Sequence, residues 1–178
     1  MTFGFFVRRA LGILRVLTVA CPLMILPRYR VAASQIPGAG QGLFIDEAVA
    51  AGRIVIAPDA IPRVYTWEEL MRLPDAEALL PATVRWFEDR YTATPEWPDE
   101  CFINHAFAPT GLWHLGFVFA RVALNPGTEI TVDYRHLLAP GQEECFLDAL
   151  EGTPIIGFDW ADSLARSTRE LGEILLRA

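Results

Sequence analysis

Short apolar runs separated by turn residues dominate the chain, and they predict many strands and few helices. Such runs end at Gly, Pro, Asn or Asp, as the strands of a mainly β protein do. A turn at Asn125-Pro126-Gly127 separates the last two of them. The predicted strands are residues 31–36, 42–45, 53–57, 112–120, 122–124 and 130–134.

Helical patterns are fewer and mostly short. Thr66 and Glu69 have the spacing of a capping box, which predicts a helix to about Leu73, before Pro74. Residues 75–92 are predicted to be helical or irregular, and residues 142–150 to be helical. A last amphipathic helix is expected after Asp159 or Asp162, with Leu164, Leu171, Ile174 and Leu175 on one face. The predicted fold class is mainly β with short helices (α+β).

Composition limits the classes of protein that the chain can belong to. Its 178 residues suffice for one domain with a sizeable core, and 52% apolar residues exclude a disordered chain. The net charge of −7 disfavours direct nucleic-acid binding and favours a basic peptide as partner. Three scattered cysteines, Cys21, Cys101 and Cys145, fit reduced thiols in a cytoplasmic protein and suggest no metal site.

Residues 1–30 are predicted to be a basic, apolar N-terminal extension. Five Arg and no acidic residue precede Asp46, and an apolar stretch from Ala10 to Leu26 is interrupted by Arg15 and Pro22. Because a central Arg costs roughly 2.5–3.5 kcal/mol on insertion, we do not expect a membrane span. An export signal ending near Ala20-Cys21, an interfacial helix, a packing extension and a gene start nearer Met24 remain as alternatives.

Three segments stand out for their chemistry. The first is a Gly-rich turn, Gly38-Ala39-Gly40-Gln41, whose glycines allow a ligand to approach the backbone. The second is Asn104-His105, followed by Pro109, and the third is Gly127-x-Glu129-x-x-x-Asp133-Tyr134. In this order and at these separations they resemble the SET domain of S-adenosylmethionine-dependent protein lysine methyltransferases. The resemblance covers roughly residues 31–135.

This resemblance implies a fold and a division of the chain. The implied fold is the β-clip SET fold, in which the Asn-His segment and the Asp-Tyr strand cross in a knot-like arrangement. The SET domain would span residues 31–138, followed by a helical C-terminal flank at 139–178. The apolar stretch 155–160 would close that flank, because the family's cysteine-rich segment is missing.

The resemblance also implies a function and site residues. The function is protein lysine N-methylation with S-adenosylmethionine, on a lysine-containing and basic protein or peptide. Tyr134 would be the catalytic residue, closing the lysine channel and orienting the amine. Cofactor contacts are implied for Gly38, Ala39, Gly40, Gln41, Asn104, His105 and Tyr134.

Other residues receive structural or secondary expectations. Glu129 and Asp133 are expected to be hydrogen-bond partners, and His114 and His136 satisfied or surface residues, with His136 an alternative channel residue. Aromatic candidates for the channel wall are Phe102, Phe117, Phe119, Tyr65 and Trp113.

An alternative function is a catalytically degenerate SET module that binds a peptide or protein. Gln41 stands where the family has an aromatic residue. Ala106-Phe107 stands where the family has Ser-Cys, and Thr110 stands where it has Asn. These changes favour the alternative. All fifteen basic residues are Arg. The absence of lysine has two explanations. One is codon bias, and the other is that a lysine-modifying enzyme without lysine cannot modify itself. The sequence does not distinguish between these two explanations.

Overall fold

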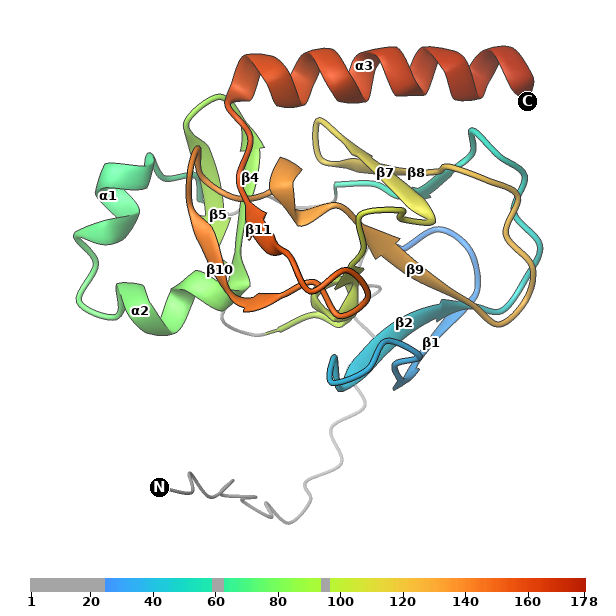
Figure 1. The fold of residues 1–178 in the computed structure, drawn as a ribbon, viewed down its shortest axis with the longest axis horizontal. Coiled ribbons are helices and arrows are strands. Elements are labelled where there is room, and N and C mark those ends of the chain that lie inside the picture. The colour runs from blue at the N-terminus through green and yellow to red at the C-terminus, as the bar shows by residue number, and fades with distance from the viewer. Residues whose placement is uncertain (1–24, 59–62, 94–96) are drawn as a thin grey trace, which may run out of the picture.

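Short strands make up most of the fold, and one long helix follows them (Figure 1). The computed structural model describes residues 25–58, 63–93 and 97–178. With η for 3-10 turns, the elements are β1 (Tyr29–Ala33), β2 (Gln41–Ile45), β3 (Ile54–Ile56), α1 (Trp67–Met71), α2 (Ala76–Leu79), η1 (Leu80–Ala82), β4 (Thr83–Phe87), β5 (Arg90–Ala93), η2 (Asp99–Phe102), β6 (Asn104–His105), β7 (Gly111–His114), β8 (Phe117–Ala120), β9 (Thr128–Val132), η3 (Tyr134–His136), β10 (Glu143–Leu147), β11 (Pro154–Ile156) and α3 (Trp160–Arg177). The α+β class predicted from the hydrophobic pattern is confirmed.

Four strands form the sheet that positions the predicted site residues. Their order is β1-β2-β9-β6, and β1, β2 and β9 pair antiparallel. The two-residue strand β6 pairs parallel with β9, so that Asn104 lies opposite Thr131 and His105 opposite Val132. The segment before Pro109 therefore lies beside the strand that leads to Tyr134.

The remaining strands form a three-stranded sheet, β3-β8-β7, and two hairpins, β4-β5 and β10-β11. Helix α3 packs against β7 and η3 and runs along one side of the molecule (Figure 1). The main core lies between the two larger sheets and includes Ile25, Leu43, Ile45, Val55, Ile56, Ile103, Val118, Ala120, Leu124, Ile130 and Val132. Full burial of a Leu, Ile or Val contributes about 1.5–3 kcal/mol each.

The start of the described chain is part of this core. Ile25 is buried and forms a bridge to Ile56 of β3, and β1 begins at Tyr29. The predicted features of residues 1–24, including the export signal, lie outside the described residues. Among the helices of the described ranges, none has the length and hydropathy needed to cross a membrane.

The capping box is confirmed. Thr66 Oγ1 accepts from the Glu69 amide at 3.1 Å, and the Glu69 carboxylate accepts from the Thr66 amide at 2.8 Å. The helix ends at Met71, two residues before the predicted end.

The first strand is displaced from its predicted position, since β1 covers Tyr29–Ala33 and not residues 31–36. Ser34 ends it, because its hydroxyl accepts from the Ile36 amide at 3.0 Å and turns the chain.

The prediction for residues 75–92 is wrong in its second half. After α2 and η1, this segment forms β4 and β5, which turn at Glu88, a residue with a positive φ of 47°. The strand β4 was not predicted because it contains a charged residue that the structure buries. Arg85 is 0% exposed and donates to the Phe158 carbonyl at 2.9 Å and to the His136 carbonyl at 3.3 Å.

The predicted strand 112–120 is two strands. Leu115 and Gly116 have φ values of 50° and 84°, and they form the two-residue turn between β7 and β8. Positive φ at both central positions matches the right-handed twist of a hairpin. Leu-Gly is not the usual sequence of such a turn, so the hydrophobic pattern predicted one continuous strand over residues 112–120. The adjacent strand predicted at 122–124 is also wrong, because only Leu124 pairs there, as an isolated bridge to Val49.

Two further predictions are corrected near the C-terminus. Residues 142–150 do not form a helix, because β10 pairs antiparallel with β11 across a tight connection. Sheet pairing overrides weak local helix propensity here. The strand predicted to end at Tyr134 ends at Val132, and Tyr134 begins η3. The Asp133 carboxylate stabilises this turn by accepting from the Arg135 amide at 3.0 Å.

The last helix is confirmed in α3, with Asp159 at its N-cap position but without a side-chain cap. Its buried residues are Ser163, Ser167 and Ile174, whereas Leu175 is 55% exposed. The face that packs on β7 and η3 is therefore partly polar, unlike the leucine-rich face predicted.

Candidate functional site

Asn104 joins the first and second predicted segments. Its side-chain nitrogen donates to the Gln41 carbonyl at 2.8 Å and to the Glu129 carboxylate at 3.0 Å. These bonds connect the edge strand β6 with its neighbour β9 and, beyond β9, with β2. Because the Gln41 contact uses only the backbone, it does not depend on the side chain at that position.

Glu129 is buried and holds the turn between β1 and β2. Its carboxylate accepts from the Ser34 hydroxyl at 2.6 Å and from the Gln35 amide at 2.8 Å. A Cβ at Gly42 would collide with this carboxylate, so a glycine is needed where Glu129 and Asn104 approach β2. The expectation that Glu129 is a structural hydrogen-bond partner is confirmed, and Asp133 has the same role toward Arg135.

The Gly-rich turn leaves its backbone accessible. Gly38 and Gly40 have φ values of 79° and 78°, a conformation that glycine adopts without strain. No atom lies within 4 Å of a Cβ built at either position. Gln41 is the residue of this turn that contacts Asn104. The turn therefore presents open main chain next to β6.

His105 connects β6 to the third segment. Its Nδ1 accepts from the Tyr134 amide at 3.1 Å, which places the ring proton on Nε2 in the neutral form. Nε2 is buried without a hydrogen-bond partner and lies 3.7 Å from Asp148 Oδ1. Burial lowers the pKa of His105, although Asp133 and Asp148 oppose the shift. His105 is therefore a neutral ring that fixes the start of η3.

Tyr134 extends from η3 back to the segment before β6. Its hydroxyl donates to the Ile103 carbonyl at 2.6 Å, and its ring lies 5.4 Å from the ring of His105. Burial raises the pKa of this hydroxyl above its usual range, so it remains a proton donor at neutral pH.

A narrow cavity of about 100 Å³ lies beside Tyr134. Its volume corresponds to roughly three water molecules at ~30 Å³ each. A space of this size suits an unbranched aliphatic side chain better than an aromatic ring. The lining is mostly apolar, with a few polar side chains. It includes Leu80, Val84, Cys101, Ile103, Trp113, Val118, Val132, Leu137, Leu138 and Glu144 beside Tyr134.

Of the five aromatic residues predicted for the channel wall, Trp113 alone lines this cavity. Phe117 and Phe119 pack on each other, with ring centres 6.2 Å apart. Phe102 packs on Trp97, and Tyr65 forms a bridge to Tyr91. These four side chains belong to other packing clusters and do not line this cavity.

Glu144 and Cys101 are polar residues of the cavity that were not identified from the sequence. Burial raises the pKa of the Glu144 carboxyl, and burial with the neighbouring Glu100 raises the pKa of the Cys101 thiol to about 11. Glu144 lies in β10, a segment predicted to be helical, so its position could not be deduced. Cys101 lies three residues before Asn104 in the sequence. Its closeness to the second segment is the sequence feature from which its position beside the site could have been inferred.

His114 and His136 are satisfied residues, as expected. Nδ1 of each lies near a serine hydroxyl of α3, at 2.9 Å from Ser167 for His114 and 2.8 Å from Ser163 for His136. His136 does not line the cavity beside Tyr134, so the alternative of a channel role is wrong. It lines a larger groove under α3.

In the described ranges, no group of three or more His, Cys, Asp or Glu is arranged to hold a metal ion. Comparison with models of known protein families found no match, and no curated protein matches the chain significantly. The functional assignment therefore depends on the residues of this chain.

Proposed function

We propose that the protein is a SET-type, S-adenosylmethionine-dependent protein lysine N-methyltransferase. One observation supports this most: the three predicted segments meet at β6. Asn104 binds the Gln41 carbonyl, His105 binds the Tyr134 amide, and Tyr134 binds the Ile103 carbonyl. Gln41 and Tyr134, from the first and third segments, thus both bond to residues 103–105, and Ile103 and Tyr134 line a small cavity.

The β-clip SET fold is part of the same proposal. Support comes from the parallel pairing of β6 with β9 and from the two hydrogen bonds that tie Tyr134 to residues 103 and 105. In a knot-like crossing, the segment before β6 and the segment after β9 must be held together in this way.

The residues present fit S-adenosylmethionine at the Gly-rich turn. Open main chain at Gly38 and Gly40 offers donors and acceptors to the amino-acid part of the cofactor, and Asn104 lies beside this turn. Gly38, Ala39, Gly40, Gln41, Asn104, His105 and Tyr134 are the residues proposed to hold it. The cofactor supplies an electrophilic methyl group; the protein supplies position, orientation and exclusion of water.

The cavity supplies what a lysine acceptor needs. Apolar walls disfavour the charged ammonium and lower the pKa of an entering lysine. Glu144, whose own pKa is raised by burial, lines the same cavity and would accept the proton that the ammonium loses. The Tyr134 hydroxyl and the Ile103 carbonyl would then orient the neutral amine.

The substrate is proposed to be a lysine in a basic protein segment. The chain carries a net charge of −7, and Glu100 and Glu144 both line the cavity. Exposed charges act over about 8–10 Å at 0.1–0.15 M salt, so association with a basic peptide should weaken as salt rises.

One observation favours the degenerate SET module as a second candidate. The Phe107 ring packs edge-on against His105, with centres 4.7 Å apart, and Arg135 stacks on its other side at 4.4 Å. This bulk stands where the family has a small polar residue, beside the proposed cofactor site. A protein that binds peptides without binding cofactor would agree with this arrangement.

Two measurements test the proposal. Calorimetry with S-adenosylmethionine should show binding, and Asn104→Ala should weaken it because the turn at Gln41 loses its anchor. Labelled-methyl transfer onto lysate proteins should then mark lysine residues. Absence of cofactor binding at millimolar concentration would refute the enzyme and favour the degenerate module. Labelled arginine in place of lysine would refute the acceptor assignment.

A further inference from the structure

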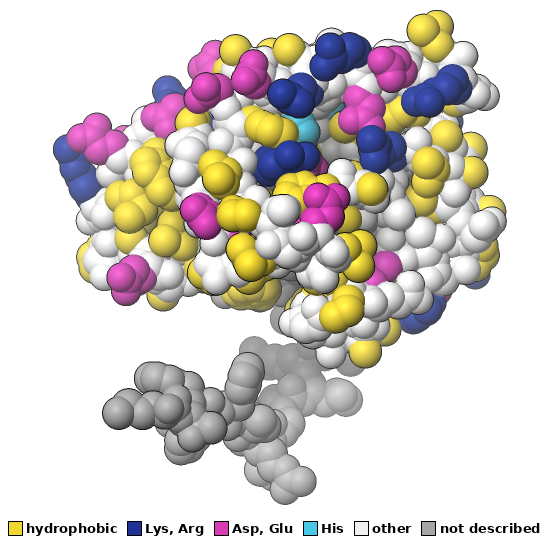
Figure 2. Space-filling model, in the orientation of Figure 1, with side chains coloured by type: hydrophobic (Ala, Val, Ile, Leu, Met, Phe, Trp, Pro, Cys, Tyr) yellow, Lys and Arg dark blue, Asp and Glu magenta, His cyan; other side chains and the backbone are white. Residues whose placement is uncertain are grey.

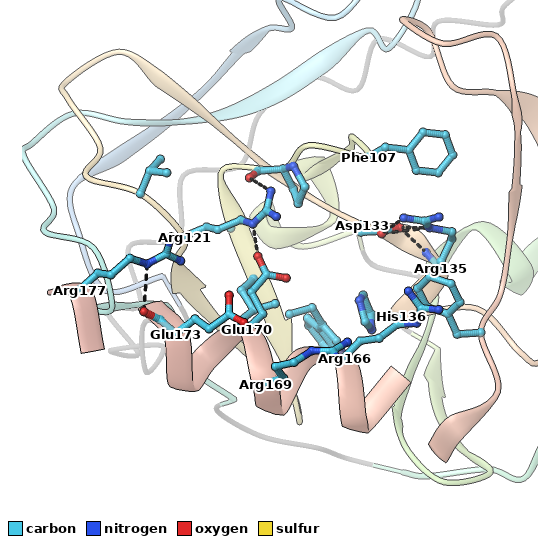
Figure 3. Close-up of a pocket in the computed structure, with 16 residues that line it drawn as sticks. Phe107, Arg121, Asp133, Arg135, His136, Arg166, Arg169, Glu170, Glu173 and Arg177 are labelled. Atoms are coloured by element: carbon cyan, nitrogen blue, oxygen red, sulfur yellow. Dashed lines mark hydrogen bonds and ion pairs between the residues drawn. The ribbon is translucent and has the colours of Figure 1, made fainter. Parts of the chain in front are cut away.

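A groove of about 530 Å³ lies between α3 and the segments 107–113, 121–122 and 133–136, and it shares only Trp113 with the lining of the cavity beside Tyr134. Figure 2 shows it as a hollow below α3, with dark-blue side chains gathered around a histidine. Arg166, Arg169 and Arg177 project from α3 on one side, and Arg121 and Arg135 face them from the other (Figure 3). Five of the fifteen arginines of the chain thus line one groove.

The protein neutralises only part of the positive charge of the groove. Arg135 pairs with Asp133 at 2.6 Å, and Arg121 pairs with Glu170. Within the described residues, Arg166 and Arg169 have no ion pair. With Glu173 included, the lining has five arginines and three carboxylates, an excess of two positive charges on a chain of net charge −7. Such an excess attracts anions into the groove.

Aromatic stacking holds two of the guanidinium groups in place. Arg135 and Arg166 lie over the same Phe158 ring, at 4.6 and 4.8 Å from its centre. Stacking leaves the N–H edge of the Arg166 guanidinium available for a ligand, whereas Arg135 gives Nε and Nη2 to Asp133 and keeps Nη1 for a ligand. Buried Arg85 donates a hydrogen bond to the Phe158 carbonyl, which fixes the backbone that carries the ring. The groove is therefore preorganised for planar, bidentate contacts to oxygen anions.

The volume of the groove suits a small ligand. A volume of about 530 Å³ is in the usual range for small-molecule sites, ~300–1,000 Å³. A nucleic acid would meet the acidic remainder of the surface, whereas a phosphate group would match the excess of two charges. We propose that this groove binds a small phosphorylated ligand, with its phosphate held by Arg166 and Arg169 of α3 together with Arg135. This proposal does not rest on the proposed methyl transfer.

The test is calorimetric titration of the full chain with inorganic phosphate and with pyrophosphate, without S-adenosylmethionine. We expect both to bind, and pyrophosphate more tightly because it reaches more of the arginines. The double variant Arg166→Gln/Arg169→Gln should weaken binding by about 10-fold or more, since it removes two charge-assisted contacts. Both side chains are exposed, so the fold should survive.

Arg53→Gln is the matched control, because Arg53 is an exposed arginine outside the groove. Its affinity for pyrophosphate should equal that of the unmodified chain. The proposal is overturned if millimolar pyrophosphate does not bind, if the double variant binds as well as the control, or if Arg53→Gln weakens binding equally. Binding of a polyglutamate peptide without binding of pyrophosphate would overturn the phosphate assignment.

Discussion

The hydroxyl of Tyr134 makes a structural bond and faces the proposed reacting centre at the same time. Tyr134→Phe removes the 2.6 Å bond to the Ile103 carbonyl but keeps the ring. We expect a stability loss of about 0.5–1.5 kcal/mol, the usual worth of one hydrogen bond. We expect methyl transfer to fall ~10²–10³-fold, as for loss of one directed donor at a reacting centre. A urea melt and a single-turnover assay measure the two effects.

Tyr29→Phe is the matched control for this variant. It also removes one hydroxyl with a hydrogen bond, to Asp99 at 2.8 Å, but Tyr29 does not line the cavity. Its turnover should be normal. If Tyr134→Phe and Tyr29→Phe behave alike, Tyr134 is a packing residue and the catalytic assignment fails.

Arg85 is a buried cation that serves the backbone of two neighbouring segments. Arg85→Met keeps much of the volume but leaves the Phe158 and His136 carbonyls without their donor. Each unsatisfied buried carbonyl costs about 1–3 kcal/mol, so the free energy of unfolding should fall by roughly 2–6 kcal/mol. Chemical denaturation measures this, with exposed Arg53→Met as control. Equal stability of the two variants would contradict the structural role of Arg85.

At the scale of elements, β2, β9 and β6 meet closely only because Gly42 has no side chain. Gly42→Ala would drive a methyl group into the Glu129 carboxylate and toward the Asn104 amide. We expect a loss of about 1–3 kcal/mol, typical of overpacking, and a weaker affinity for S-adenosylmethionine. Thermal melting and calorimetry with the cofactor report the two changes separately.

Gly172→Ala supplies the opposite case within the same chain. Gly172 lies in α3 with nothing near its Cβ, so alanine should stabilise the helix by about 0.5–1 kcal/mol. If Gly42→Ala is as harmless as Gly172→Ala, the close approach of the three strands does not depend on glycine.

Elements with a complete local signal were predicted from the sequence, and those shaped by distant partners were not. The Thr66–Glu69 capping box is of the first kind, because both capping residues lie in the pattern itself; the pattern also predicted α3 as a helix, although not the face that it buries. β4 and β10 are of the second kind. Arg85 looks like a surface residue until two remote carbonyls bind it, and β10 is a strand because β11 lies beside it.

The candidate site shows the same limit. Asn104, His105 and Tyr134 are joined by hydrogen bonds, and their segments were selected from the sequence. The cavity lining was not, apart from Trp113 and Tyr134, because Glu144 reaches it from a strand that pairs with distant residues. Sequence patterns selected segments that meet in the fold; tertiary packing decides which side chains surround them.

At the scale of the whole molecule, buried histidines make stability depend on pH. Burial lowers the pKa of His105 and of His136, and their unfolded value is 6.5. Below pH 6.5 the unfolded chain binds more protons than the folded chain, so stability falls as pH decreases toward the folded pKa values. Each histidine contributes a slope of up to about 1.4 kcal/mol per pH unit in this window.

Urea unfolding at pH 7.5, 6.5 and 5.5 tests this dependence, and the free energy of unfolding should decrease below pH 6.5. Glu144 acts in the opposite direction, because its raised pKa makes the folded chain bind the extra proton as pH falls toward 4.5. Glu144→Gln should therefore steepen the loss of stability in acid, while His136→Gln should flatten it. Stability that is constant from pH 7.5 to 5.5 in the unmodified chain and in both variants would show that the two rings are not held neutral by the fold.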